Sequence, residues 1–257
     1  MRNTYSEAAT AQRYDSARGL PPETMSLWMS TMKASIPEVA IKRTLDLGCG
    51  TGRFTQALSE AFACSAVGVE PSVAMLEVAA ARGDADVEWK LGDAEDIPLA
   101  DQFVDLVFMS QVFHHLSNPQ RALAEIRRVL TPNGYLVLRN GTREHNHELE
   151  WLRFFPDARR IEDARTPSSS EIESAISDEH FLAITHQTIR QAFATSYPRY
   201  FEKIGRRGLS SLIAISEDAF QDGMANFKSW IDQQPADTIV YEPVDIFIFQ
   251  KRTGIAL

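Results

Sequence analysis

The sequence has few cysteines and comparatively little positive charge. Only Cys49 and Cys64 occur, and two isolated cysteines predict reduced thiols rather than a disulfide framework. Basic residues number 26 against 35 acidic ones. Nucleic-acid binding requires a basic surface, so this balance argues against a nucleic-acid partner. We expect the partner to be a small molecule, and the oligomeric state stays open.

Long apolar runs are also missing. No stretch approaches the roughly 20 apolar residues that cross a bilayer. The opening residues MRNTYSEAATAQRYD are polar and lack the apolar region of a secretory signal. We therefore expect a cytoplasmic protein with no membrane partner.

The sequence does contain a regular alternation of apolar strands and amphipathic helices. Five strands are predicted between residues 41 and 140, in the segments RTLDLG, SAVGVE, VEWKLGD, FVDLVFMS and YLVLRN. The segment TPNG (131–134) is predicted to be the turn into the fifth strand. Strands separated by helices in this way predict a parallel sheet with helices on both faces, an α/β fold.

The second half of the chain is less regular. LAITHQTIR and DIFIFQKR predict two more strands, and Ser168 with Glu171 forms a capping-box pattern that begins a helix. About 50 residues with helical patterning lie between these strands, and we expect them to form a cap. The predicted organisation is one structural domain with four parts: an N-terminal helical lid (1–40), a ligand-binding core (41–140), the rest of the sheet (141–257), and a cap insertion within that last part (about 193–240).

The stretch TLDLGCGTGRF (44–54) carries the main functional signal. Gly48, Gly50 and Gly52 follow a strand, where glycines let the backbone approach a ligand closely. Glu70 comes 20 residues after Gly50, at the end of the next strand, where a carboxylate can accept ribose hydroxyls. Dinucleotide sites favour G-x-G-x-x-G, whereas this turn is G-x-G-x-G after Asp46. An acid in that position suits an ammonium group better than a pyrophosphate.

Four stretches occur together in one order and spacing: LDLGCGTGRF, VGVEPSVAMLEVA, GDAEDIPLADQFVDLVFMSQVFHHL and PNGYLVL. In these the chain resembles the class I S-adenosyl-L-methionine (SAM)-dependent methyltransferases, especially their small-molecule "type 11" branch. The resemblance implies a Rossmann-like, mostly parallel sheet of seven strands in the order 3-2-1-4-5-7-6, with the last strand antiparallel. It also implies methyl transfer from SAM to a small-molecule acceptor, with S-adenosyl-L-homocysteine (SAH) as the product.

The same resemblance assigns roles to individual residues. Asp46 and the glycine turn would hold the methionine part of SAM, and Glu70 would bind the ribose. The full set of implied cofactor-binding residues is Asp46, Gly48, Cys49, Gly50, Glu70, Pro71, Ser72, Met75, Asp93, Ala94, Ser110, Gln111, Tyr14 and Arg18. His114 or His115 is a candidate catalytic base, although a histidine packed against the following helix explains the pair equally well. No metal site is predicted, because the histidines of HNHE (145–148) lack partners at a known spacing.

The acceptor pocket has to come from the less patterned parts of the chain. The predicted substrate-binding residues are Asn140, Trp151, Tyr197, Arg206, Arg207 and Ser210. Arg199, Lys203, Arg206 and Arg207 share one helical face if the helix continues past Gly205. Such a face is ordinarily solvated surface, but Arg206 or Arg207 could instead bind a carboxylate on the acceptor.

Three alternative functions stay open at the level of sequence. A SAM enzyme of another reaction type, such as cyclisation of SAM or aminocarboxypropyl transfer, would share the same cofactor motifs. A non-catalytic SAM-binding module would share them as well. A nicotinamide-dependent enzyme is disfavoured by the form of the turn and by Asp46.

Overall fold

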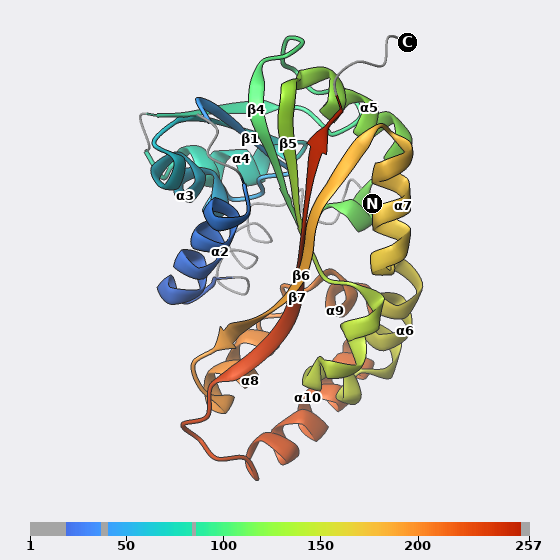
Figure 1. The fold of residues 1–257 in the computed structure, drawn as a ribbon. Helices are drawn as coiled ribbons and strands as arrows, with labels where there is room; N and C mark the ends of the chain where they lie inside the picture. Colours follow the sequence, from blue (N-terminus) through green and yellow to red (C-terminus); the bar gives the residue numbers. More distant parts are fainter. Residues whose placement is uncertain (1–18, 37–40, 84–85, 253–257) are drawn as a thin grey trace.

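The structure is a computed structural model that describes residues 19–36, 41–83 and 86–252. A seven-stranded sheet has the order β3-β2-β1-β4-β5-β7-β6 (Figure 1). Strands β1 to β5 pair in parallel, and β7 is antiparallel to both β5 and β6. This topology confirms the predicted fold class. The strands are β1 (Arg43–Leu47), β2 (Ser65–Glu70), β3 (Val87–Leu91), β4 (Val104–Ser110), β5 (Leu130–Asn140), β6 (Phe181–Ala194) and β7 (Val240–Lys251).

Helices connect the strands and cover both faces of the sheet (Figure 1). The α-helices are α2 (Pro22–Ser35), α3 (Arg53–Phe62), α4 (Val73–Ala80), α5 (Pro119–Val129), α6 (Pro156–Arg165), α7 (Ser169–Asp178), α8 (Tyr197–Gly205), α9 (Ser210–Ala214) and α10 (Glu217–Ile231). Three 3-10 helices are η1 (Phe113–His115), η2 (Arg143–Glu148) and η3 (Glu150–Phe154). Ser168 and Glu171 form the predicted capping box at the start of α7.

Alternation along the central strands builds two separate cores. In β4, Val107 and Met109 join a core with helices α5 and α7, whereas Leu106 and Phe108 join a core with α2 and α3. Successive side chains of a strand point to opposite faces, and both faces are covered here. The strand is therefore apolar on both sides, as its sequence suggests.

A third core lies away from the sheet. Strands β6 and β7 extend beyond their neighbours to reach it, and α8, α9 and α10 fill the connection between them (Figure 1). These helices pack with η3 and α6 around buried Tyr200, Phe155 and Phe227. No helix in the part of the chain that the structure describes is both long and apolar enough to cross a membrane.

Two predicted strand boundaries need correction. The TPNG segment lies inside the bounds of β5, where Asn133 has a φ of 64° and the pairing with β4 shifts register between Val104 and Leu106. Strand β6 is longer than the segment predicted from alternation, because its pairing with β7 continues to Ala194. Backbone pairing, which the side-chain pattern does not report, sets both boundaries.

The predicted basic face required a helix that continues past Gly205, and this condition is not met. Helix α8 ends at Gly205, Arg206 is its C-cap, and Arg207 has a left-handed φ of 52°. The helix therefore does not carry Arg207 onto the face of Arg199 and Lys203.

Candidate functional site

Asp46 is a buried acid at the carboxyl edge of the sheet. Its side chain is in β1 and only 2% of the residue is exposed. The Thr55 hydroxyl of α3 donates a 2.6 Å hydrogen bond to its Oδ2. Burial raises the pKa of Asp46 to about 7, with the bond from Thr55 opposing this rise and the nearby Glu70 charge adding to it. A cation placed beside this carboxyl would favour its ionised form.

The glycine turn connects β1 to α3 in a conformation that suits glycine. Gly48, Gly50 and Gly52 have φ values of 73°, 57° and 77°, a region that other residues adopt only with strain. A Cβ on Gly48 would lie 2.5 Å from Val112 Cγ2. Between the first two glycines, burial raises the pKa of the Cys49 thiol, which disfavours a reactive thiolate. The backbone of this turn can therefore come close to a bound ligand.

Glu70 lies at the end of β2 and contacts this turn. Its Oε2 accepts from the Gly50 N–H at 3.0 Å, and its Oε1 accepts from the Ser72 N–H at 3.0 Å. Burial raises the pKa of Glu70, while these two bonds oppose the rise. The Ser72 hydroxyl accepts a hydrogen bond from the N–H of buried Met75 at 3.3 Å, and this bond caps α4. Pro71, directly before Ser72, is exposed. The carboxylate therefore faces the edge where the turn and α4 meet.

The remaining predicted cofactor residues follow β3 and β4. Asp93 Oδ1 accepts from the N–H of Glu95 at 2.9 Å, and Ala94 is buried beside it. Ser110 ends β4, and Gln111 has a φ of 59°, an uncommon conformation for a residue other than glycine. The Gln111 N–H donates to the Arg139 carbonyl at 2.8 Å, and its Oε1 accepts from the Gly141 N–H at 3.2 Å. Both Ser110 and Gln111 line a cavity.

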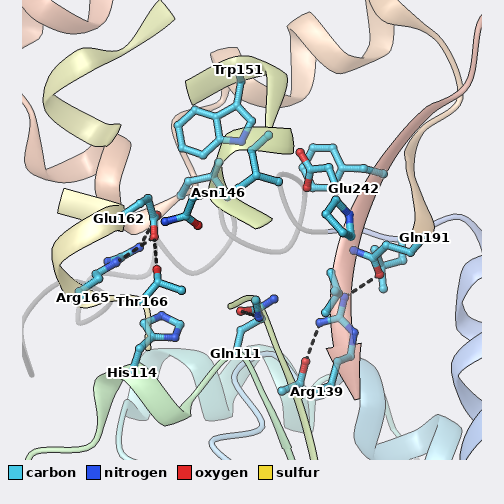
Figure 2. A pocket seen from close by; sticks show the side chains of 18 of the residues that line it. Gln111, His114, Arg139, Asn146, Trp151, Glu162, Arg165, Thr166, Gln191 and Glu242 are labelled. Atoms are coloured by element: carbon cyan, nitrogen blue, oxygen red, sulfur yellow. Dashed lines mark hydrogen bonds and ion pairs between the residues drawn. The ribbon is translucent and has the colours of Figure 1, made fainter. Parts of the chain in front are cut away.

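That cavity, of about 100 Å³, lies between the sheet edge and the third core. Figure 2 shows His114, Gln111 and Arg139 on one side of it, with Trp151 and Asn146 on the other. Its wall mixes aromatic, charged and amide side chains. The residues that line it are Leu20, Arg53, Phe54, Ser110, Gln111, His114, Arg139, Gly141, Asn146, Leu149, Trp151, Glu162, Arg165, Thr166, Gln191, Phe193, Leu209, Glu242, Pro243 and Val244.

Four of the charged side chains in this wall form two different kinds of contact. Arg165 and Glu162 of α6 form an ion pair with an Nη2–Oε1 distance of 2.6 Å, and Thr166 also donates to Glu162 (Figure 2). Arg139 donates to Ser110 Oγ at 2.9 Å and to Gln191 Oε1 at 2.7 Å. Glu242, which is buried, accepts from the Tyr200 hydroxyl at 3.3 Å.

The predicted catalytic and acceptor residues are only partly gathered at this cavity. His114 and Trp151 line it, whereas His115 does not, and the ring centroids of the two histidines are 4.1 Å apart. Asn140 is buried next to the lining residue Gly141, and its Nδ2 donates to the Gly141 carbonyl at 2.7 Å. The predicted cofactor residues Tyr14 and Arg18 lie outside the described residues.

Four other predicted acceptor residues do not line the cavity. Arg206 is exposed at the end of α8, Ser210 is buried in α9, and Tyr197 packs edge-on against Trp230. Arg207 donates to the carbonyls of Leu212 at 2.8 Å and Ile215 at 2.6 Å, and it pairs with Glu217. Its guanidinium therefore holds the backbone around α9.

Sequence reasoning missed most of the polar wall. The missed polar lining residues are Arg53, Arg139, Asn146, Glu162, Arg165, Thr166, Gln191 and Glu242. Arg139 offered a signal, because it is a charge inside the otherwise apolar strand YLVLRN. A charge in a strand that is covered on both faces needs a polar environment. Asn146 and Glu162 offered no such signal, since polar residues are ordinary in a charged segment such as GTREHNHELEWLRFFPDARRIEDARTP.

No group of three or more metal-ligating side chains exists within residues 19–36, 41–83 and 86–252. Comparison with known families finds that residues 45–138 match the model described as "Methyltransferase domain". That range contains the glycine turn, Glu70, Asp93 and Ser110, so the match covers the sheet-edge site.

Two relatives extend the comparison in sequence. An uncharacterized methyltransferase of Mycobacterium bovis is 41% identical over 133 residues, which are 52% of this chain and 49% of that protein. The chain thus covers about half the length of that relative. An uncharacterized methyltransferase of Schizosaccharomyces pombe is 30% identical over 203 residues, which are 79% of this chain and 76% of that protein.

A solved structure supports the fold over most of the chain. A protein from Anabaena variabilis, described as a methyltransferase of an antibiotic biosynthesis pathway, superposes with a TM-score of 0.70 at 20% identity. The alignment covers 88% of this chain and 97% of that one.

Proposed function

The chain belongs to the class I SAM-dependent methyltransferases, and on this premise we propose that it transfers a methyl group from SAM to a small-molecule acceptor. The observation that carries the proposal is the sheet-edge site, where a left-handed glycine turn, Asp46 and Glu70 converge. The adjoining cavity has a partly aromatic wall suited to a small acceptor.

The residues at the sheet edge fit the cofactor chemically. The Gly48–Gly52 turn has no Cβ atoms at its glycines, so its backbone can approach a ligand. Asp46, with its pKa raised to about 7, would be stabilised in its ionised form by the ammonium group of SAM. Glu70 offers two carboxylate oxygens suited to the ribose hydroxyls. When bound, SAM supplies an electrophilic methyl group on a sulfonium.

The chain's own residues would then bind and orient the acceptor. Gln111 and Ser110 lie at the end of β4, beside the turn, and the cavity continues from them toward Trp151. His114 borders the same space, and we propose that it accepts a proton from an acceptor hydroxyl or amine. Alignment and removal of water supply most of the rate enhancement expected for such a displacement. We also propose that the acceptor carries a carboxylate, but Arg206 and Arg207 are no longer proposed to bind it.

Calorimetric titration with SAM tests the cofactor site. Glu70→Ala should weaken SAM binding by about 1.5–3 kcal/mol, because a half-buried charged acceptor of hydrogen bonds is lost. Glu70→Gln keeps an acceptor oxygen and should lose less. Glu77→Ala, at an exposed position of α4, is the matched control and should bind SAM like the unsubstituted protein. Full-strength binding by Glu70→Ala would contradict the site.

Product analysis separates methyl transfer from the other SAM chemistries. The protein is incubated with SAM and a fraction of metabolites below about 1 kDa, and the nucleoside products are measured. Release of SAH supports methyl transfer. Release of methylthioadenosine would favour cyclisation or aminocarboxypropyl transfer instead. Tight SAM binding with no turnover in any fraction would favour a non-catalytic module.

A further inference from the structure

Three primary amides line the cavity: Gln111 directly after β4, Asn146 in η2 and Gln191 in β6. Figure 2 shows Gln111 on one side of the cavity and Asn146 on the other. A carboxamide has an oxygen that accepts hydrogen bonds and an NH2 group that donates them. The protein partner of one end therefore decides which end is left for a ligand.

The partner of Asn146 is a carboxylate. Asn146 is only 4% exposed, and its Nδ2 donates to Oδ1 of Asp163 in α6 at 2.9 Å. Asp163 Oδ2 accepts from Arg159 Nε at 2.8 Å. Burial alone would raise the pKa of Asp163, but the bonds from Asn146 and Arg159 lower it overall. An ionised carboxylate only accepts, so Asn146 has to turn its NH2 group toward Asp163. Its Oδ1, which accepts no hydrogen bond from the described residues, is left for the cavity.

The two glutamines are oriented in the opposite sense. Gln111 Oε1 accepts from the Gly141 N–H at 3.2 Å, and a backbone N–H only donates. Gln191 Oε1 accepts from Trp28 Nε1 at 2.9 Å and from Arg139 at 2.7 Å. The oxygens of both glutamines thus face the protein. Their NH2 groups donate no hydrogen bond to the described residues and are left for the cavity.

The amides give the cavity a hydrogen-bonding polarity. The sheet supplies the two NH2 donors, and η2 supplies the amide oxygen. Glu162, Arg165 and Thr166 in the same wall instead bond to one another. A hydrogen-bonding group that a bound ligand covers without pairing it costs binding free energy. A complementary ligand therefore has an acceptor toward the sheet and a donor toward η2.

We propose that the methyl acceptor donates a hydrogen bond to Asn146 Oδ1 and accepts hydrogen bonds from Gln111 Nε2 and Gln191 Nε2. Asp163 is the positioning residue, because it fixes the orientation of the Asn146 amide. This inference rests on the proposed function and names the acceptor class, which is a carbonyl compound or carboxylic acid that also carries a hydroxyl or amine. The carboxylate or carbonyl oxygen faces the glutamines, and the hydroxyl or amine faces η2.

NMR titration with a matched pair of planar probes tests the inference. γ-Pyridone has a ring N–H opposite its carbonyl, and γ-pyrone has the same shape with a ring oxygen in place of the N–H. Titrations use the SAH-saturated protein, and SAH affinity is measured first for every variant. The unsubstituted protein should bind γ-pyridone at least about tenfold more tightly than γ-pyrone, because the ring oxygen leaves Asn146 Oδ1 without a donor. Asn146→Leu, which is similar in size, should reduce this ratio at least about fivefold.

Substitutions of the glutamines should act on both probes alike. Gln111→Glu and Gln191→Glu each keep an oxygen for the protein partners and replace the NH2 group that faces the probe carbonyl. Each variant should weaken γ-pyridone and γ-pyrone at least about fivefold and keep their ratio within about twofold.

Two variants of α6 separate positioning from folding. In Asp163→Asn the new amide can donate as well as accept, so Asn146 is free to turn and the probe ratio should fall at least about threefold. Arg159→Gln is the matched control, because it leaves the Asp163 carboxylate in place and should keep the ratio. A merely structural role for Asp163 would weaken both probes together and leave their ratio unchanged.

The outcomes distinguish this inference from the proposed function. Failure of the unsubstituted protein to bind SAH would overturn the proposed function. Normal SAH binding without measurable binding of γ-pyridone, or with equal affinity for both probes, would overturn only the inference. A ratio that survives in both Asn146→Leu and Asp163→Asn, or that falls in Arg159→Gln, would overturn it as well. Loss of SAH affinity in a glutamine variant would overturn the assignment of that glutamine to the methyl acceptor.

Discussion

At the scale of single residues, Asp46 combines burial with a weak set of stabilising contacts. Its ionised form gains one short hydrogen bond from Thr55 but loses most of its hydration, and Glu70 adds a second negative charge nearby. The balance leaves the folded protein with an acid that holds its proton up to about pH 7. Acids with raised pKa values concentrate at functional sites, because a ligand of opposite charge can stabilise the ionised form that burial disfavours.

The raised pKa of Asp46 predicts that the stability of the protein depends on pH. The pKa of Asp46 is 3.8 in a model peptide and about 7 in the folded protein, so the folded state binds the proton more tightly between these values. The contribution of protonated Asp46 to the free energy of unfolding is fully present below about pH 4 and is lost as the pH rises through about 7. Asp46→Asn should therefore increase the free energy of unfolding at pH 8 by a few kcal/mol and flatten its slope between about pH 4 and pH 7. Urea denaturation at several pH values measures both effects.

The same substitution should weaken SAM binding at pH 8, because the asparagine amide cannot neutralise the ammonium group. The ligand's own titration is common to both proteins and cancels in the comparison. An unchanged SAM affinity in Asp46→Asn would show that the carboxylate does not contact the cofactor.

At the scale of elements, the glycine turn depends on a neighbouring strand as well as on its own backbone. Trp89 of β3 lies over the turn, so a Cβ on Gly52 would come within 2.4 Å of its Cη2. Gly68 of β2 is under the same ring, with a Cβ contact of 2.5 Å. The indole therefore occupies the space that these two glycines leave, and it packs against the turn.

Gly52→Ala should be more destabilising than Gly83→Ala. Both glycines have left-handed φ values, 77° and 74°, so each substitution carries about 1–2 kcal/mol of backbone strain. Only Gly52 has Trp89 within reach, and overpacking should add about 1–3 kcal/mol there. Chemical denaturation of both variants measures the difference, and the Trp89→Leu background should reduce the extra cost. Equal losses at the two glycines would contradict the packing argument.

At the scale of the whole molecule, the described residues form three cores with different roles. Two cores flank the sheet and hold the strands that end in the sheet-edge site. The third core, formed by η3, α6, α8, α9, α10 and the ends of β6 and β7, supplies Trp151, Phe193 and Leu209 to the opposite wall of the cavity. The predicted division into lid, core and cap remains a proposal. The separation of the third core from the two cores that flank the sheet supports the predicted cap.

Damage to the third core should leave the cofactor site intact. Phe227 is fully buried there and contacts the rings of Phe154, Tyr200 and Trp230. Phe227→Ala should cost about 3–5 kcal/mol of stability in that core. We expect faster hydrogen exchange in α8 and α10, with SAH affinity changed less than about threefold. Loss of SAH affinity together with faster exchange in β1 and β4 would show instead that the cores unfold as one unit.

The sequence by itself determined the sheet and the residues that we propose for the cofactor side of the candidate site. Apolar strands, amphipathic helices and the G-x-G-x-G turn are local patterns, and each one constrains the backbone within a few residues. They were sufficient for the strand order expected from the resemblance, which the structure confirms. The residues Asp46 and Glu70 could be placed because each lies in or at the end of a strand whose neighbours are recognisable.

Only the tertiary structure decided the acceptor side. Gln191 of β6 contacts both Arg139 of β5 and Trp28 of α2, although 52 or more positions of the sequence separate each pair. No local periodicity connects these residues. Arg207 shows the converse, since its position in the sequence suggested a ligand site whereas its guanidinium holds carbonyls of the α9 segment. The physical reason is that strand and turn formation depends on neighbours in the chain. A polar cavity instead depends on which distant charges folding brings together.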